Sequence, residues 1–123
     1  MQQITITAGD VSATAELFAG PTADAIWEAL PLEAAANTWG EEIYFAIPVT
    51  ADEEPDARAG VAVGDLGYWP PGHAFCIFFG RTPASSGDAP RAASPVNVIG
   101  RVISDATVFR RVRSGARVCL ARA

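Results

Sequence analysis

Lysine is absent from this chain of 123 residues, and it has only one His, one Met and two Cys. All nine basic residues are therefore Arg, set against 14 Asp and Glu, and the formal net charge is −5. Nonspecific binding to nucleic acid or to an anionic membrane needs a basic surface, so this charge disfavours both partners. Arg residues do gather between positions 101 and 122, which leaves a local basic face open beside the alternative of a solvated strand-and-turn surface.

Long hydrophobic runs are also missing. No segment approaches the ~20 apolar residues that span a bilayer, and residues 1–7 lack the basic region and apolar run of a signal peptide. We therefore expect a cytoplasmic protein, in which Cys76 and Cys119 stay free and buried in apolar strands. Two isolated Cys and one His do not make a credible zinc site. Without a phosphate loop or a Rossmann glycine set, we expect no cofactor.

The residues that are present describe one globular domain spanning residues 1–123. Half of them are hydrophobic and 19% are charged. Residues 4–7 and 11–18 alternate apolar and polar side chains around a Gly-Asp turn, which predicts a β-hairpin. Residues 22–30 carry apolar side chains at helical spacing, so we expect a short helix with Thr22 as its N-cap, ended by Pro31.

Short strands are predicted for most of the remaining chain, at residues 43–47, 61–63, 66–69, 74–79, 97–103 and 116–120. We read residues 52–56 as an acidic connector, 84–95 as a long surface loop and 104–112 as a single capped turn. This gives seven or eight strands, one clear helix and no βαβ rhythm. A closed antiparallel barrel capped by helix fits best, with a β-sandwich as the alternative.

The most distinctive segment is residues 64–83, in which a strand, a Pro-Pro-Gly turn and a second strand hold five of the eleven Phe, Trp and Tyr residues. Residues 74–79 have no polar position, so both faces of that strand must be buried. Trp69 precedes Pro70 and Pro71, and it forms either an aromatic wall for a ligand or a rigid turn packed on proline rings. A cis bond before either proline stays open.

Glu42 and Tyr44 are the best polar pair, because alternation places them on one face of a strand. Glu42 either accepts a hydrogen bond from a ligand, or works as an acid or base, or is solvated like Glu41. His73 lacks an orienting partner and reads as an exposed turn residue. Arg81 and Thr82 either bind an anion together, or Arg81 pairs with a carboxylate of the chain.

A family resemblance enters through motifs spread over nearly the whole chain. Residues 75–115 resemble the C-terminal half of a cyclophilin, through Phe-Cys-Ile-Phe-Phe, a Ser/Gly loop, Ile-Gly-Arg-Val and a short turn. A closer resemblance is to small, uncharacterised bacterial and archaeal cyclophilin-like proteins. It is carried by residues 21–23, 26–31, 39–45, 64–72, 77–83 and 97–100. It implies a mainly β fold: a closed antiparallel eight-stranded cyclophilin-like β-barrel capped by one or two short helices.

The resemblance weakens at the residues that do the chemistry. Catalytic cyclophilins use an Arg beside an apolar pocket containing Phe, Trp and His. Aligning the shared motifs places Val96 at the family's His and Cys76 at its pocket Phe, and the strand at residues 43–45 brings no Arg. The resemblance therefore implies a relative that lacks the usual isomerase residues.

Three functions follow from this sequence. The first is a binding module that holds a short peptide or a small apolar ligand in an aromatic cleft, without cyclophilin catalysis. The alternative is a peptidyl-prolyl cis/trans isomerase working without the usual Arg, and the last is a small hydrolase or isomerase centred on Glu42 and Tyr44. We expect a monomer or small homo-oligomer. The predicted ligand-binding residues are Trp39, Glu42, Tyr44, Trp69, Phe79, Thr82, Pro83, Ser85 and Asn97.

Overall fold

A computed structural model describes residues 2–123 of the chain. It opens with the predicted antiparallel hairpin, formed by β1 (Gln2–Ala8) and β2 (Val11–Leu17). Gly9 makes the turn at φ 58°, a left-handed conformation that glycine adopts without steric cost. The buried side chains of both strands alternate along the chain, so the hairpin lays one face on the core.

Helix α1 (Pro21–Ala29) follows, and the prediction of its N-cap was wrong. Gly20 occupies the cap position, and proline suits the first helical turn because its missing N–H would have no partner there. Thr22 is instead buried, and its hydroxyl donates to the Glu54 carboxylate. The helix ends before Pro31 as predicted. The cis peptide bond found among residues 2–123 joins Leu30 to Pro31, not either of the later prolines.

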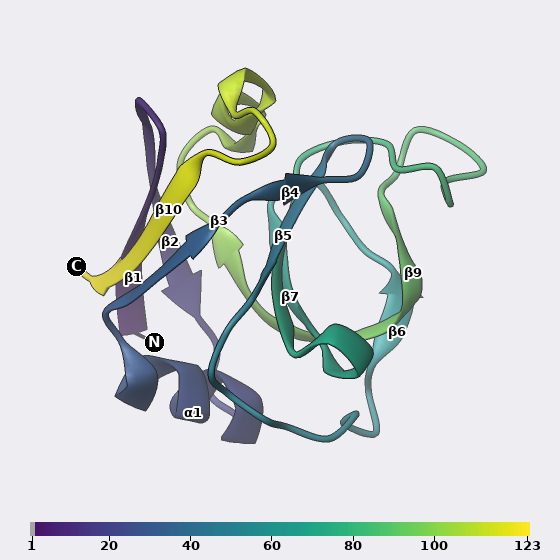
Figure 1. Ribbon diagram of the computed structural model, residues 1–123. Coiled ribbons are helices and arrows are strands. Elements are labelled where there is room, and N and C mark those ends of the chain that lie inside the picture. The colour runs from purple at the N-terminus through teal and green to yellow at the C-terminus, as the bar shows by residue number, and fades with distance from the viewer. Residues whose placement is uncertain (1) are drawn as a thin grey trace.

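The rest of the chain consists mostly of short strands joined by turns (Figure 1). The predicted single turn is present, and Asp105 caps it by accepting a hydrogen bond from the Thr107 N–H at 2.9 Å. The elements are β3 (Leu32–Ala35), β4 (Asn37–Thr38), β5 (Glu42–Ala46), β6 (Arg58–Gly60), β7 (Asp65–Trp69), η1 (Pro70–Gly72), β8 (Ala74–Phe78), β9 (Arg91–Val102), η2 (Ala106–Arg111) and β10 (Arg117–Arg122).

Two predicted boundaries were wrong, one at β6 and one at β9. Residues 61–63 are not a strand; the strand there, β6, ends at Gly60. Residues 91–95 were assigned to a loop but form the first half of β9, which pairs with β6. Their Ala, Ser and Pro content is typical of a loop. Pro95 is tolerated because the β6–β9 register is irregular between its two paired positions, where a proline need not donate.

The strands form one antiparallel sheet of ten strands, in the order β3-β10-β1-β2-β9-β7-β8-β5-β4, with β6 attached to β9. The predicted closed eight-stranded barrel was therefore wrong in both respects: the ladder has ends, and there are ten strands. Mainly β architecture with a few short helices was predicted correctly. Figure 1 shows the sheet curled around its own interior, with α1 at one end.

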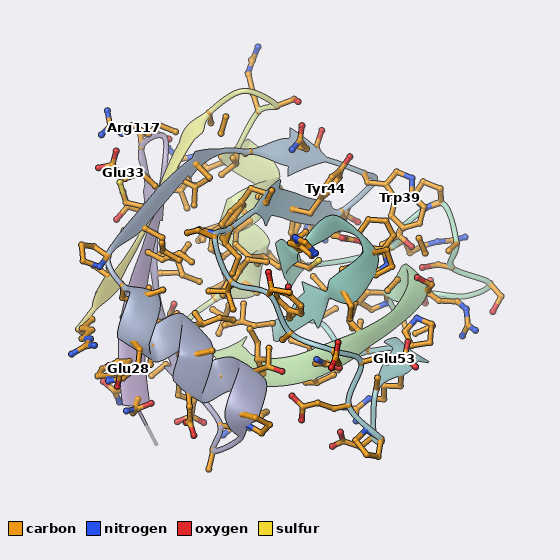
Figure 2. All side chains as sticks on the ribbon, turned by 60° about the horizontal axis from the view of Figure 1, so that its bottom comes forward. Glu28, Glu33, Trp39, Tyr44, Glu53 and Arg117 are labelled. Atoms are coloured by element: carbon orange, nitrogen blue, oxygen red, sulfur yellow. The ribbon has the colours of Figure 1, made fainter. Side chains whose placement is uncertain are left out.

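The two ends of the sheet are adjacent in the chain. β3 pairs with β10, β4 pairs with β5, and only Ala36 separates β3 from β4. The Ala36 N–H donates to the Ala116 carbonyl oxygen at 2.8 Å, and the Ala36 oxygen accepts from the Gly115 N–H at 2.7 Å. The strand thus changes partners at one residue, and we call residues 32–38 the seam. Glu33 of the seam forms an ion pair with Arg117 of β10 (Figure 2).

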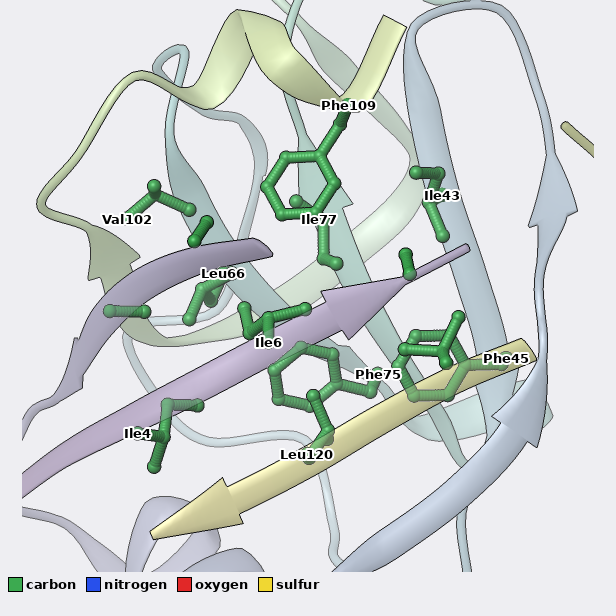
Figure 3. Packing of buried hydrophobic residues seen from close by; sticks show 14 of the residues in the cluster. Ile4, Ile6, Ile43, Phe45, Leu66, Phe75, Ile77, Val102, Phe109 and Leu120 are labelled. Atoms are coloured by element: carbon green, nitrogen blue, oxygen red, sulfur yellow. The ribbon is translucent and has the colours of Figure 1, made fainter. Parts of the chain in front are cut away.

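The main hydrophobic core fills the inside of the curled sheet. Figure 3 shows Ile4 and Ile6 of β1, Phe75 of β8 and Leu120 of β10 turned toward one another. Phe45 and Phe75 stack with ring centroids 5.4 Å apart. Each Å² of apolar surface buried stabilises the fold by ~25 cal/mol. Burial of this core is therefore the dominant favourable term in folding.

A second, smaller cluster lies on the opposite face of the sheet. It contains Ala74, Cys76 and Phe78, which alternate along β8 with the core residues on its other side. Every position of β8 is buried, as its lack of polar residues predicts. The first half of β9 provides the cover, through Ala92 and Val96. This outer cluster is where the candidate site forms.

Candidate functional site

A pocket of about 230 Å³ opens over the outer cluster, between β5, β7 and β8 and the first half of β9. Strand register explains how β5 and β8 meet there: Tyr44 on β5 lies opposite Cys76 on β8, and Glu42 shares the face of Tyr44. The Trp39 N–H donates to the Glu42 carbonyl oxygen at 2.9 Å, which fixes the turn leading into β5. The pocket is mainly apolar and is lined by Trp39, Glu42, Tyr44, Trp69, Cys76, Ala92, Ala93 and Val96.

Gly67 on β7 allows β9 to approach the outer face. A Cβ at this position would lie 3.0 Å from Val96 Cγ2 and 3.2 Å from Phe78 Cε2. The β7–β9 register also shifts between Leu66 and Gly67, which is the mark of a β-bulge. Glycine here lets Val96 settle on the sheet, and the bulge redirects the first half of β9 into the pocket wall.

Trp69 is held from two sides. Its indole N–H donates to Ser94 Oγ at 2.7 Å, and a Cβ on Gly72 would meet its ring at 2.8 Å. Pro70 and Pro71 begin the 3-10 turn that brings Gly72 under the ring, and His73 closes it in the left-handed region at φ 48°. The rigid turn is therefore present, and the Trp69 ring, which contacts Gly72, also lines the pocket. That Trp69 forms a wall for a ligand stays a prediction.

Glu42 is the polar centre of the pocket. It is only 6% exposed, and within residues 2–123 its Oε1 atom has no hydrogen-bond partner. Burial raises the pKa of Glu42 from 4.5 to about 7, because desolvation penalises the charged carboxylate, while the Cys76 thiol lowers this pKa in part. The Cys76 sulfur also lies 3.8 Å from the Ala74 carbonyl oxygen, so we treat the thiol as a weak partner of the carboxyl.

Cys76 itself is buried, and its pKa is raised well above the usual value, mainly by burial and also by the nearby Glu42 carboxylate. The thiol therefore stays protonated and is not a ready nucleophile. Both cysteines are free, as predicted, although Cys119 is only half-buried.

Four of the nine predicted ligand-binding residues line the pocket: Trp39, Glu42, Tyr44 and Trp69. The other five lie elsewhere. Phe79 is buried in the main core, with its ring centroid 6.2 Å from that of Phe109. Thr82 and Ser85 hydrogen-bond around their own loop: the Thr82 hydroxyl donates to the carbonyl oxygen of Arg91, the first residue of β9, and the Ser85 hydroxyl donates to the Ala89 carbonyl oxygen at 2.8 Å. Pro83 is an exposed member of that loop.

Asn97 is 1% exposed, and its hydrogen bonds all serve the fold. Its Nδ2 group donates to Thr22 Oγ1 at 3.1 Å and to the Asp52 carbonyl oxygen at 2.9 Å. Its Oδ1 atom accepts from the Glu54 N–H at 2.8 Å. The amide thus ties β9 to α1 and to the acidic connector.

Sequence reasoning missed four lining residues as ligand contacts: Cys76, Ala92, Ala93 and Val96. A signal existed for two of them, because the cyclophilin alignment placed Cys76 and Val96 at that family's pocket Phe and His. Ala92 and Ala93 could not be found once their segment was assigned to a loop.

Most of the late Arg residues that could form a local basic face have acidic partners. Arg101 pairs with Glu16 at 2.9 Å, Arg110 with Glu41 at 2.6 Å and Arg111 with Asp10 at 3.0 Å. Arg122 stacks over Trp27, 4.6 Å from the ring centroid. No helix in the described part of the chain is both apolar and long enough to cross a membrane. Residues 2–123 hold no cluster of three potential metal ligands.

Comparison with known protein families shows where this architecture belongs. A sequence model of the cyclophilin-like family matches residues 2–121. The chain belongs to the cyclophilin-like family. Its structure is similar to the solution structure of a hypothetical protein from Archaeoglobus fulgidus, with a TM-score of 0.83 and 39% sequence identity. That match covers 99% of this cyclophilin-like chain and 95% of the archaeal one. No curated protein matches the chain.

Proposed function

We propose that this cyclophilin-like protein binds a short peptide or a small, mostly apolar ligand in the outer pocket, without the catalysis of prolyl isomerases. One observation carries the proposal: an open apolar pocket contains a buried carboxyl oxygen that has no hydrogen-bond partner among residues 2–123. A mainly apolar cleft with a few oriented polar groups is the usual form of a small-ligand site. Leaving a buried acceptor unpaired costs ~1–3 kcal/mol, which a ligand donor would recover.

Binding is favoured over isomerase activity by the character of the lining. Catalysis of prolyl rotation calls for a donor near the imide nitrogen, a role that the resemblance assigns to an Arg. The residues lining the pocket include neither Arg nor His. Glu42 is the one ionisable carboxyl among them, and it lacks the oriented partner of a general base.

A blocking variant tests the binding proposal. Ala93 is exposed at the pocket rim, so Ala93→Phe should fill the pocket without disturbing the core. Ala35→Phe, at an exposed position on β3, is the matched control. Short apolar peptides and small aromatic compounds would be titrated while the Trp69 and Trp39 indole resonances are followed by NMR. We expect shifts in the wild type and in Ala35→Phe, and none in Ala93→Phe.

Exchange spectroscopy on Xaa-Pro peptides tests the alternative. We expect no acceleration of cis/trans exchange, even at high protein concentration. Acceleration that Ala93→Phe abolishes would replace the binding-only function with an isomerase.

A further inference from the structure

The pocket offers a ligand two kinds of contact. Trp39, Tyr44 and Trp69 contribute aromatic surface, and Glu42 contributes the unpartnered Oε1 atom. Trp39 and Tyr44 lie near each other on this side of the sheet (Figure 2). Two indoles and a phenol around one carboxyl form a setting in which a cation gains both charge pairing and attraction to aromatic faces.

Other ligand groups fit this carboxyl less well. A wholly apolar ligand would cover Glu42 and leave its oxygen without a hydrogen bond. A ligand carboxylate would meet a like charge, and the lining residues include no basic side chain to offset it. A ligand carbonyl could be bound only by the protonated acid. An ammonium group supplies both a donor and the compensating charge.

The net charge of the whole molecule also favours a cationic ligand. The chain carries a formal charge of −5 and has no Lys. Such a surface attracts small cations toward it and repels anions.

The size of the pocket limits the ligand. A 150 Å³ cavity can hold benzene, so about 230 Å³ has room for one ring with a short substituent. The pocket is too small for an extended peptide to be enclosed in it, although one side chain or a chain terminus would fit.

We propose that the ligand is an organic ammonium ion on a small apolar body, with an N–H donating to Glu42 and the body packed against Trp39, Tyr44 and Trp69. This inference rests on the proposed function, since it names the ligand class of the same pocket. Because Glu42 must be ionised to pair with the cation, and its pKa is about 7, binding strengthens as the pH rises through neutrality.

Benzylammonium and its neutral analogue benzyl alcohol provide the test, followed by NMR shifts of the tryptophan indoles. Between pH 6 and pH 8 we expect the affinity for benzylammonium to rise about tenfold, following the ionised fraction of Glu42. At pH 8 it should exceed the affinity for benzyl alcohol at least tenfold. Glu42→Gln should lose this preference, while Glu53→Gln, the same change at an exposed site outside the pocket, should keep it.

Two further compounds, phenylalaninamide and its N-acetylated form, show whether the ammonium group belongs to a peptide terminus or to a free amine. If phenylalaninamide binds and the acetylated form does not, a peptide terminus is an accepted source; if benzylammonium alone binds, the source is a free amine.

Failure of this inference differs from failure of the proposed function. Two results would overturn the ammonium ligand and leave pocket binding intact. One is that benzyl alcohol binds as tightly as benzylammonium at pH 8, and the other is that the affinity for benzylammonium falls as the pH rises. If no probe shifts the indole signals, pocket binding itself fails. The wild-type pH series decides the matter even if Glu42→Gln does not fold.

Discussion

Glu41 and Glu42 are neighbours in the sequence with opposite surroundings. Glu41 pairs with Arg110 at the surface, and Glu42 is buried with an unpaired oxygen. Strand alternation was enough to place Glu42 and Tyr44 on one face. It could not predict how deeply Glu42 is buried, because the cover comes from a segment of β9 with the composition of a loop.

The raised pKa of Glu42 makes stability depend on pH. Folding favours the protonated acid, so this stabilisation is complete below pH 4.5 and is lost as the pH rises through about 7. A shift of this size corresponds to at most about 3 kcal/mol. We expect the free energy of unfolding of Glu42→Gln, measured by urea unfolding, to rise relative to that of the wild type as the pH goes from 5 to 8. Glu53→Gln should show no such gain, and an equal gain in both variants would contradict the assignment to Glu42.

Asn97 shows how one residue can hold several elements together. The sequence suggested a ligand contact, whereas in the structure its amide serves the fold. Its hydrogen bonds to Thr22, Asp52 and Glu54 join segments far apart in the chain. Such tertiary partners leave no periodic signal in the sequence.

We expect Asn97→Ala to lower the free energy of unfolding by about 2–4 kcal/mol, because it leaves several buried polar groups unpaired. Asn37→Ala, which removes a single exposed bond to the Tyr44 carbonyl, should cost less than about 1 kcal/mol. Chemical denaturation midpoints would compare the two. Equal losses would show that burial of the Asn97 network has little energetic weight.

At the scale of elements, the sequence predicted the opening hairpin, α1, β7, β8 and the capped turn, because each has a strong local pattern. It did not predict β3, β4 or β6. These strands have at most four residues, and they exist through pairing with distant partners, which local propensity does not report.

Gly67→Ala tests how β9 is positioned. The added methyl would crowd Val96 and Phe78, so we expect a loss of about 1–3 kcal/mol in stability. The displaced β9 should also move the Trp69 indole resonance and weaken ligand binding. Gly87→Ala, which meets nothing within 4 Å, is the control and should leave both unchanged. An unshifted Trp69 resonance in Gly67→Ala would show that β9 does not depend on this contact.

At the scale of the whole molecule, the seam at residues 32–38 joins the two ends of the sheet. The cyclophilin resemblance led to a closed ring of eight strands. In the structure, the strand changes partners at Ala36, so the ladder is interrupted there while the chain itself continues. No sequence pattern marks such a change, because Leu-Glu-Ala-Ala-Ala-Asn-Thr contains neither a turn signal nor clear alternation.

Ala36→Pro should disrupt the seam. It removes the N–H that bonds to the Ala116 carbonyl oxygen, and we expect a loss of about 2–4 kcal/mol. Ala36→Gly keeps the donor and should lose about 1 kcal/mol through backbone entropy alone. Thermal unfolding would compare them. Similar melting temperatures for the two variants would mean that the hydrogen bond at the seam is dispensable.

The seam also sets how much free strand edge the sheet presents. An exposed strand edge is a template on which another molecule can extend the sheet and begin to aggregate. Here the terminal strands of the sheet have four and two residues, and the attached β6 has three. Edges this short offer few free backbone groups to a second copy. The way the sheet ends thus disfavours edge-to-edge pairing, the route to aggregation that a chain half hydrophobic in composition would otherwise leave open.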